Sequence, residues 1–290
     1  MILREALRKA SERLERHRVS SPRLNAEVIL SHCLSVDKTY LYTHDERGLE
    51  AHECQKLEDA LYERISGVPL QYIVGREEFY GRNFTVNTDV LIPRPETEYI
   101  VESVLELHPA PKSSLIDVGT GSGCIGLTLA LELPEARVTI TDISYPALVT
   151  AKANAIQLGA TVSIVCMDML EAAGGPFDIV VCNPPYVRPK ESSSLQVEVR
   201  EHEPHLALFA DEDGLSNYRK LIPCAKRVLK PGGYLIMEIG AGMEKRVLDL
   251  FDSQWHLLPT RKDLQGIPRT VVARSSPEGR GWDIKKWRAR

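Results

Sequence analysis

The sequence predicts an α/β protein in which a doubly wound, mostly parallel sheet follows a small helical N-terminal domain and a β-hairpin linker. Apolar residues recur at helical spacing through the first part of the chain, up to about residue 85. From about residue 114, apolar runs of strand length alternate with helical stretches, which is typical of a sheet buried on both faces. A length of 290 residues with 43% hydrophobic residues suits one large domain or two smaller ones.

The N-terminal part is expected to contain three helices. The first is indicated by apolar residues at helical spacing, namely Leu3, Leu7, Ala10 and Leu14. Ser21 and Pro22 resemble a helix cap followed by a first-turn proline, which predicts a second helix that ends at Leu34. A third helix is expected over residues 51–65 and stops near Gly67.

A β-hairpin is expected to connect this helical part to the sheet. Residues 71–74 and 78–86 have the composition of two short strands joined by a glycine-containing turn. The expected units are residues 1–85 with the hairpin near 70–87, residues 86–276, and a polar, basic tail at 277–290.

The second part of the chain alternates between strand and helix patterns. Five strands are expected, at residues 114–118, 138–141, 162–165, 177–181 and 234–238. Helices fit between them at residues 123–133, 145–158 and 214–229. A last pair of strands, near residues 255–258 and 270–273, could close a seven-stranded sheet as an antiparallel hairpin.

The bulk composition argues against several classes of protein. The formal net charge is −4, whereas proteins that bind nucleic acid usually carry a basic excess. No apolar run could span a bilayer and the N-terminus lacks the apolar core of a signal peptide, so we expect a cytoplasmic protein. We also expect it to be a monomer. The six cysteines form no C-x-x-C pair, which favours buried free thiols and no metal site.

A glycine-rich turn follows the first predicted strand of the sheet. After Asp117 it contains Gly119, Thr120, Gly121, Ser122 and Gly123, and it opens a helix. Glycines let the backbone pass close beneath a ligand. Asp142 ends the next strand, where a carboxylate can accept hydrogen bonds from a ribose diol, and Ile143 follows it. A tight turn that binds nothing would give the same glycine pattern.

Two ligands fit this turn. Gly121, Gly123 and Gly126 satisfy the dinucleotide fingerprint G-x-G-x-x-G, in which a helix N-terminus holds the pyrophosphate of NAD. S-adenosylmethionine has no phosphate, and its ammonium group could be received by Asp117, directly or through water. Because a carboxylate favours a cationic ligand and opposes a pyrophosphate, the residues favour S-adenosylmethionine.

The third strand also ends at a carboxylate. Asp168 follows this strand as Asp142 follows the second, and open α/β sheets bind ligands at the carboxyl ends of their strands. Asp168 could accept a hydrogen bond from an adenine amino group, with Met169 packed on the ring. A helix cap or a solvated loop carboxylate is the alternative for Asp168.

The fourth strand runs straight into Asn183, Pro184, Pro185 and Tyr186. The lone pair of an amide or exocyclic amine nitrogen is delocalised, so a site that methylates such a nitrogen must hold both N–H groups and aim the nitrogen. The Asn183 side-chain oxygen and the Pro184 carbonyl can accept those N–H groups, the prolines stiffen the loop, and Tyr186 offers a flat face. Positioning of this kind can supply roughly 7–11 kcal/mol of a reaction barrier.

The chemistry of this segment leaves alternatives open. It does not distinguish a glutamine amide, such as one in a ribosomal protein, from an adenine amine in DNA or RNA. A flipped adenine calls for a basic approach groove that the composition does not indicate. A NAD-dependent oxidoreductase would leave the segment unexplained. A binding module without catalysis is disfavoured by the intact Asn183.

With both motifs in register, the chain resembles the class I S-adenosylmethionine methyltransferases, which have a Rossmann-like seven-stranded sheet. Asn-Pro-Pro-Tyr is shared by their adenine-N6 and glutamine-N5 members. Further matches favour the second group: Leu91-Ile92-Pro93-Arg94-Pro95-Glu96-Thr97-Glu98, residues 69–75, Glu203-Pro204, Ala207-Leu208, residues 213–215 and 263–266, and Arg269. Nearly the whole chain thus resembles the peptide-chain release factor glutamine N5-methyltransferases, the HemK/PrmC family.

This resemblance implies a substrate and a set of site residues. The substrate is the glutamine of the Gly-Gly-Gln motif in class I release factors, and the product of the cofactor is S-adenosylhomocysteine. The resemblance assigns glutamine binding to residues 183–186 and cofactor binding to residues 119–123, Asp142 and Asn183. Arg94 and Glu96 are further candidates beside the substrate, although a rigid interdomain linker would also explain them. The position after Asp168 is often aromatic in the family, and here it is Met169.

Overall fold

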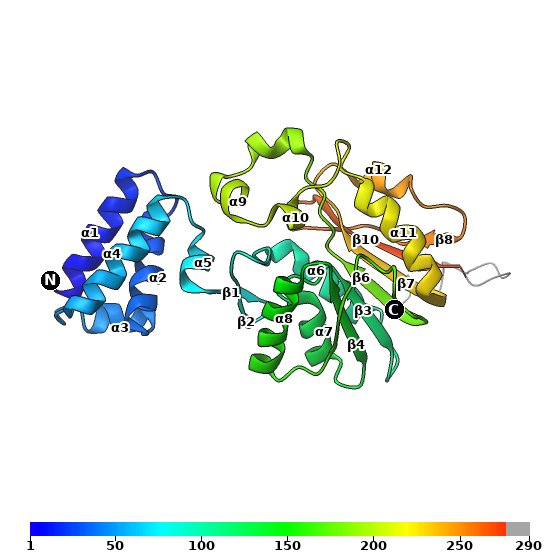
Figure 1. Ribbon diagram of the computed structural model, residues 1–290, viewed down its shortest axis with the longest axis horizontal. Coiled ribbons are helices and arrows are strands. Elements are labelled where there is room, and N and C mark those ends of the chain that lie inside the picture. The colour runs from blue at the N-terminus through cyan, green and yellow to red at the C-terminus, as the bar shows by residue number, and fades with distance from the viewer. Residues whose placement is uncertain (277–290) are drawn as a thin grey trace.

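The computed structural model describes residues 1–276, and its first part is a group of helices. They are α1 (Leu3–Arg16), α2 (Pro22–Leu34), α3 (Lys38–Thr43), α4 (Ala51–Ile65) and α5 (Leu70–Val74). Figure 1 shows them gathered on one side of the molecule, away from the sheet. Their apolar faces meet in a core of their own, in which Leu14, Ile29 and Leu30 are completely buried. The three predicted helices are confirmed, and α3 was not predicted.

The predicted strand at residues 71–74 is wrong, because this segment forms α5. The carbonyl of Pro69 accepts hydrogen bonds from the backbone N–H groups of Tyr72 (3.1 Å) and Ile73 (3.2 Å), which starts a helical turn. Gly75, with a φ of 72°, ends the helix in the left-handed conformation. The β-branched composition that suggested a strand is overridden by these contacts.

The hairpin that does form is shorter than predicted and comprises β1 (Arg76–Phe79) and β2 (Arg82–Thr85). Tyr80 and Gly81 make its two-residue turn, both with positive φ, as such turns require. Phe79 and Phe84 are buried with ring centroids 6.1 Å apart, and they pack into the core beside the large sheet. The hairpin is therefore fastened to the second part of the chain.

The large sheet has the strand order β5-β4-β3-β6-β7-β10-β8, with the short β9 paired to β10. The strands are β3 (Ser114–Val118), β4 (Arg137–Asp142), β5 (Ser163–Cys166), β6 (Phe177–Cys182), β7 (Leu229–Glu238), β8 (Trp255–Leu257), β9 (Arg261–Lys262) and β10 (Pro268–Ser275). β3 to β7 are parallel, and β10 runs antiparallel to β7 and β8. The five parallel strands and the closing antiparallel pair are confirmed.

Helices cover both faces of the sheet (Figure 1). The helices of this part are η1 (Pro95–Thr97), α6 (Glu98–Glu106), α7 (Cys124–Glu132), α8 (Tyr145–Leu158), α11 (Ser216–Val228) and α12 (Glu244–Leu248). Residues of α6, α7 and α8 share one core and residues of α11 and α12 the other. Leu115 of β3 packs into the first core and Ile116 into the second, as predicted for strands buried on both sides.

The chain makes an excursion between β6 and α11. It contains η2 (Pro189–Ser194), α9 (Val197–His202) and α10 (His205–Leu208). The buried guanidinium of Arg64, from α4, donates to Asn25 Oδ1 (2.7 Å) and to the carbonyl of Val68 (2.9 Å). It also donates to Glu198 of α9 (2.5 Å). The excursion, which leaves the sheet at the end of the central strand β6, therefore connects the sheet to the helical part.

Other features of residues 1–276 bear on the class of protein. No described helix is both long enough and apolar enough to cross a membrane. In the described range, no three or more His, Cys, Asp or Glu side chains gather where they could hold a metal ion. The six cysteines are free thiols, and three of them are buried. The predicted tail at 277–290 lies outside the described residues.

Candidate functional site

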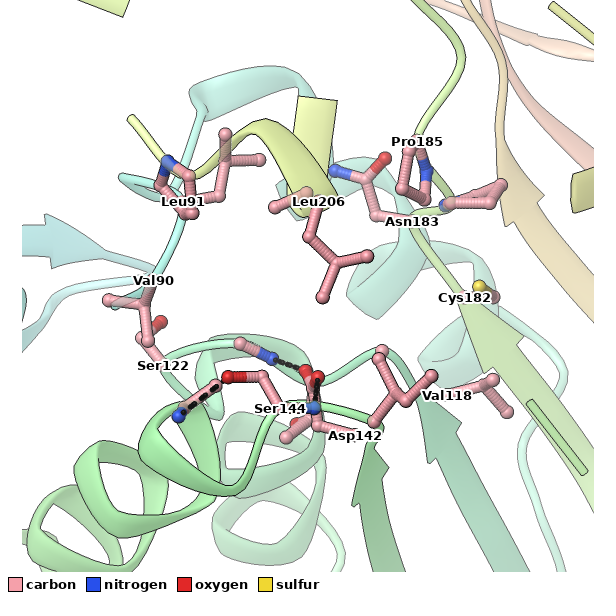
Figure 2. Close-up of a pocket in the computed structure, with 18 of the residues that line it drawn as sticks. Val90, Leu91, Val118, Ser122, Asp142, Ser144, Cys182, Asn183, Pro185 and Leu206 are labelled. Atoms are coloured by element: carbon pink, nitrogen blue, oxygen red, sulfur yellow. Dashed lines mark hydrogen bonds between the residues drawn. The ribbon is translucent and has the colours of Figure 1, made fainter. Parts of the chain in front are cut away.

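A cavity of about 300 Å³ lies at the carboxyl ends of the parallel strands (Figure 2). One wall is the glycine turn after β3 and the end of β4, and the opposite wall is the segment after β6. α10 and the segment before η1 lie across the opening. Its lining includes these predicted residues: Arg94, Gly119, Thr120, Gly121, Ser122, Asp142, Ile143, Asp168, Met169, Asn183, Pro184 and Pro185. A cavity of this size and position suits a small-molecule ligand.

The glycine turn leaves space for a ligand beside its backbone. Gly119 (φ 69°) and Gly121 (φ 56°) adopt left-handed conformations, and a Cβ at either position would project into open space. Asp142 accepts hydrogen bonds from the backbone N–H groups of Gly121 (2.9 Å) and Ser144 (2.8 Å), drawn as dashed lines in Figure 2. Burial raises the pKa of Asp142, and these N–H groups oppose that rise. The carboxylate thus fixes the turn while it faces the cavity.

Asp117 lies beneath the turn and does not line the cavity. Its Oδ2 accepts hydrogen bonds from the Thr120 hydroxyl (2.5 Å) and from the backbone N–H of Gly126 (3.0 Å). Its Oδ1 is buried and has no partner. Burial raises the pKa of Asp117 to about 7. The structure therefore places this carboxylate behind the turn and not at the cavity surface.

The far end of the cavity is lined by Asp168, Met169 and Ile143. Met169 has a φ of 46°, a backbone conformation that non-glycine residues adopt infrequently. Ile143 is half exposed and presents apolar surface to the cavity. Leu206 of α10 points into the cavity from the side opposite Asp142 (Figure 2). Together these side chains give this end of the cavity an apolar surface.

The segment from Asn183 to Tyr186 begins where β6 ends. The Asn183 side-chain nitrogen donates to the Thr97 hydroxyl (3.1 Å), and Asn217 donates to the carbonyl of Pro185 (2.8 Å). Within residues 1–276, neither Asn183 Oδ1 nor the Pro184 carbonyl is recorded in a hydrogen bond. Both acceptors that the sequence pointed to are therefore available.

Three other predicted residues do not line the cavity. Gly123 is the N-cap of α7, with a φ of 86° that favours glycine and with the end of the Leu127 side chain where a Cβ would lie. The ring of Tyr186 packs against the sheet core, and burial raises the pKa of its hydroxyl. Glu96 lies near Arg269, with 3.9 Å between Oε1 and the guanidinium. These three residues could therefore affect a ligand only through neighbouring residues that do line the cavity.

Thr97, Glu238, Glu203 and Leu206 were not predicted as site residues, although Thr97 and Glu203 lie in segments that carry the family resemblance. Thr97 lines the cavity and donates to Glu238, while the buried Glu203 pairs with Arg94 and accepts from the backbone of Ile92. Glu238 had a usable signal, because it ends an apolar parallel strand as Asp142 does. The short α10 gave no pattern from which Leu206 could have been found.

The residues present fit S-adenosylmethionine better than a dinucleotide. Asp142 faces the turn and Asp117 lies beneath it, with one oxygen of Asp117 left without a partner. Two carboxylates at this turn oppose a pyrophosphate and favour the cationic sulfonium and ammonium groups. The turn, the strand order and the segment after β6 define a class I S-adenosylmethionine-dependent methyltransferase.

Comparison with known proteins narrows this class. The PrmC N-terminal domain matches residues 5–75, and the methyltransferase small domain matches residues 97–202. The release factor glutamine methyltransferase of Koribacter versatilis is 45% identical over 277 residues, which cover 94% of this chain and 99% of that protein. The enzyme of that name from Nitratidesulfovibrio vulgaris is 39% identical over 279 residues, with 94% and 95% covered. The chain belongs to the release factor glutamine methyltransferase family.

A solved structure supports the fold alone. A methyltransferase from Pyrococcus furiosus superposes with a TM-score of 0.51 at 15% identity, and covers 68% of this chain and 91% of its own. The family and the fold class that the sequence predicted are both confirmed.

Proposed function

We propose that this chain transfers a methyl group from S-adenosylmethionine to the side-chain N5 of the glutamine in the Gly-Gly-Gln motif of class I release factors. One observation carries this proposal: two acceptors, Asn183 Oδ1 and the Pro184 carbonyl, stand free on a rigid loop at the wall of the cavity. A primary amide has two N–H groups, so the two acceptors match its donors. The names of the relatives point to the same substrate.

The cofactor occupies the wall formed by the glycine turn. S-adenosylmethionine supplies a methyl group bound to a positively charged sulfur, which a nucleophilic nitrogen can attack. Asp142 accepts from the ribose diol, and Gly119 and Gly121 let the amino-acid end lie close to the backbone. Asp168 is the acceptor for the adenine amino group, with Ile143 and Met169 against the ring.

The glutamine amide occupies the opposite wall. Asn183 and Pro184 hold its two N–H groups, which aims the nitrogen toward the cofactor and limits its freedom to turn away. Arg94 is tied to Glu203 and stiffens the approach to the cavity, while Tyr186 supports the loop from behind. No strong base is needed before transfer, because the methylated nitrogen is acidic and releases its proton afterwards.

The substrate class is tested with S-adenosylmethionine labelled on its methyl group. The chain is incubated with a class I release factor, with the same factor carrying alanine in place of the motif glutamine, and with double-stranded DNA. Label on the first protein alone is the expected result. Label on DNA, or on both release factors equally, would favour the adenine alternative or another residue.

The helical N-terminal domain is proposed to dock the protein substrate. It has its own apolar core, and Arg64 connects it to α9 of the excursion, whose next helix α10 lines the cavity. Affinity for the release factor is measured for residues 76–276, which keep the hairpin that packs into the sheet core, and for the full chain. Equal affinities would refute the docking role. The cytoplasmic location, the monomeric state and the lack of nucleic acid binding remain predictions.

A further inference from the structure

The orientation of the Asn183 side chain depends on two buried residues from other segments. Asn183 Nδ2 donates to the hydroxyl of Thr97 at 3.1 Å, and that hydroxyl donates to Oε2 of Glu238 at 2.6 Å. Thr97 ends η1 and Glu238 ends β7, and each side chain is only 2% exposed. The Thr97–Glu238 hydrogen bond is therefore buried, whereas the one from the partly buried Asn183 lies at the cavity wall.

The chemistry of the three groups fixes the direction of each hydrogen bond. An ionised carboxylate can only accept, so the Thr97 hydroxyl must give its one hydrogen to Glu238. The same hydroxyl can then only accept from Asn183, and only the amide nitrogen of Asn183 can donate. The amide oxygen is consequently turned away from Thr97 and left for a ligand. A flipped amide would place two acceptors against each other.

Glu238 also contacts the other end of the Asn-Pro-Pro-Tyr segment. Its Oε1 accepts from the Tyr186 hydroxyl at 3.4 Å, and its backbone carbonyl accepts from Tyr218 at 3.1 Å. One carboxylate thus supports the first residue of the segment through Thr97 and the last residue directly. The neighbouring β7 residues Ile236 and Met237 are completely buried apolar side chains, so a charge here carries a desolvation cost.

We propose that Glu238, acting through Thr97, is a positioning residue that fixes the Asn183 amide with its oxygen toward the substrate N–H. This inference rests on the proposed function, because it assumes that Asn183 holds a substrate nitrogen. Glu238 touches neither substrate nor cofactor in this role. It supplies the acceptor that decides which atom of Asn183 faces the cavity.

Protonation of Glu238 should reverse the chain of hydrogen bonds. Burial and the nearby Glu96 raise the pKa of Glu238 to about 7, while Thr97, Arg269 and Tyr186 oppose that rise. A protonated carboxyl can donate to Thr97, whose hydroxyl can then donate to Asn183 and favour the flipped amide. Because the ionised form predominates above pH 7, the rate of methyl transfer should fall as the pH drops below that value.

The test compares two threonines that lie on either side of Glu238. Thr97→Val removes the hydroxyl that joins Glu238 to Asn183. Thr270→Val is the matched control, because Thr270 faces Glu238 across the β7–β10 ladder, is fully buried, and has a hydroxyl without a partner. Thr97→Val should lower kcat by about 10- to 100-fold with the cofactor Kd within about twofold, whereas Thr270→Val should stay within about threefold of the wild type.

Two further variants separate positioning from a structural role. Thr97→Ser keeps the hydroxyl and should recover most of the activity. Glu238→Gln cannot ionise, so the fall of kcat below pH 7 at saturating cofactor should disappear. Asp117 is the other group whose pKa is raised to about 7, and saturating cofactor removes its effect on binding. An equal loss in Thr97→Val and Thr270→Val, or an unchanged acid limb in Glu238→Gln, would overturn the proposal.

A measurement that needs no substrate tests the positioning role separately from the proposed function. Exchange of the Asn183 side-chain N–H hydrogens with solvent is followed by NMR, with Asn183→Ala used to assign the signal. Exchange should be slower in the wild type and Thr97→Ser than in Thr97→Val. If exchange behaves so but no release factor is labelled, the proposed substrate is wrong and the positioning role stands. Identical exchange in all three proteins would refute the positioning role.

Discussion

The two walls of the cavity are held in place differently. On the cofactor wall, Asp142 contacts Gly121 and Ser144, which are 21 and 2 residues away in the chain. On the amide wall, Thr97 contacts Asn183 and Glu238, which are 86 and 141 residues away. The cofactor wall is thus built from two neighbouring strand ends that lie close together in the sequence. The amide wall exists only when the whole sheet has assembled, so the two walls should fail separately when residues are changed.

The largest effect is expected from Asn183→Ala. This change removes an acceptor for the substrate amide and leaves the glycine turn intact, so activity should fall by about a thousandfold or more. The cofactor Kd should stay within about tenfold, because Asn183 contributes only one edge of that site. Labelled methyl transfer and calorimetric titration measure the two quantities. Unchanged turnover would remove Asn183 from the mechanism.

Asp142→Ala should act on the opposite wall. The ribose loses a charged acceptor and the N–H groups of Gly121 and Ser144 lose theirs, so the cofactor Kd should rise by about 10- to 100-fold. Glu135→Ala, an exposed carboxylate before the other end of β4, is the control and should leave the Kd unchanged. Equal Kd values for both variants would contradict the assignment.

Asp117→Asn should make the chain more stable and weaken its binding of the cofactor. The pKa of Asp117 is raised in the folded chain, so the stability that it contributes is lost as the pH rises from about 4 to about 7. An asparagine does not ionise, so the cofactor-free variant should melt a few degrees above the wild type at pH 8 and less so at pH 5. Its cofactor Kd should rise severalfold. The same melting difference at both pH values would count against this account.

Leu206→Ala should have the smallest effect. Leu206 is 62% exposed, yet it extends into the cavity from α10 (Figure 2), so its loss should weaken cofactor binding by about two- to fivefold. Leu264→Ala is the control, since Leu264 is 98% exposed and does not line the cavity. If both variants bind the cofactor as the wild type does, α10 contributes no apolar contact.

The sequence predicted the cofactor wall better than the amide wall. The glycine turn, Asp142 and Asp168 were found because strand ends and glycine spacing are local patterns. The strand-end rule also applied to Glu238, but its neighbours in the chain gave no sign of a ligand. The role of Thr97 could not be predicted, because it depends on contacts with residues far away in the sequence. The segment at 71–74 was predicted wrongly because the helical turn that starts at Pro69 and ends at Gly75 outweighed its strand composition.

The hydrogen bond from Thr97 to Glu238 also bears on protein design. A loop with the sequence Asn-Pro-Pro-Tyr, transplanted onto another sheet, would keep its stiffness from the prolines. Its asparagine would be free to present either end of the amide, because nothing in those four residues distinguishes them. Transfer of this chemistry to a new scaffold therefore requires three separate segments, the loop, a hydroxyl and a buried carboxylate, and their mutual distances must be built together.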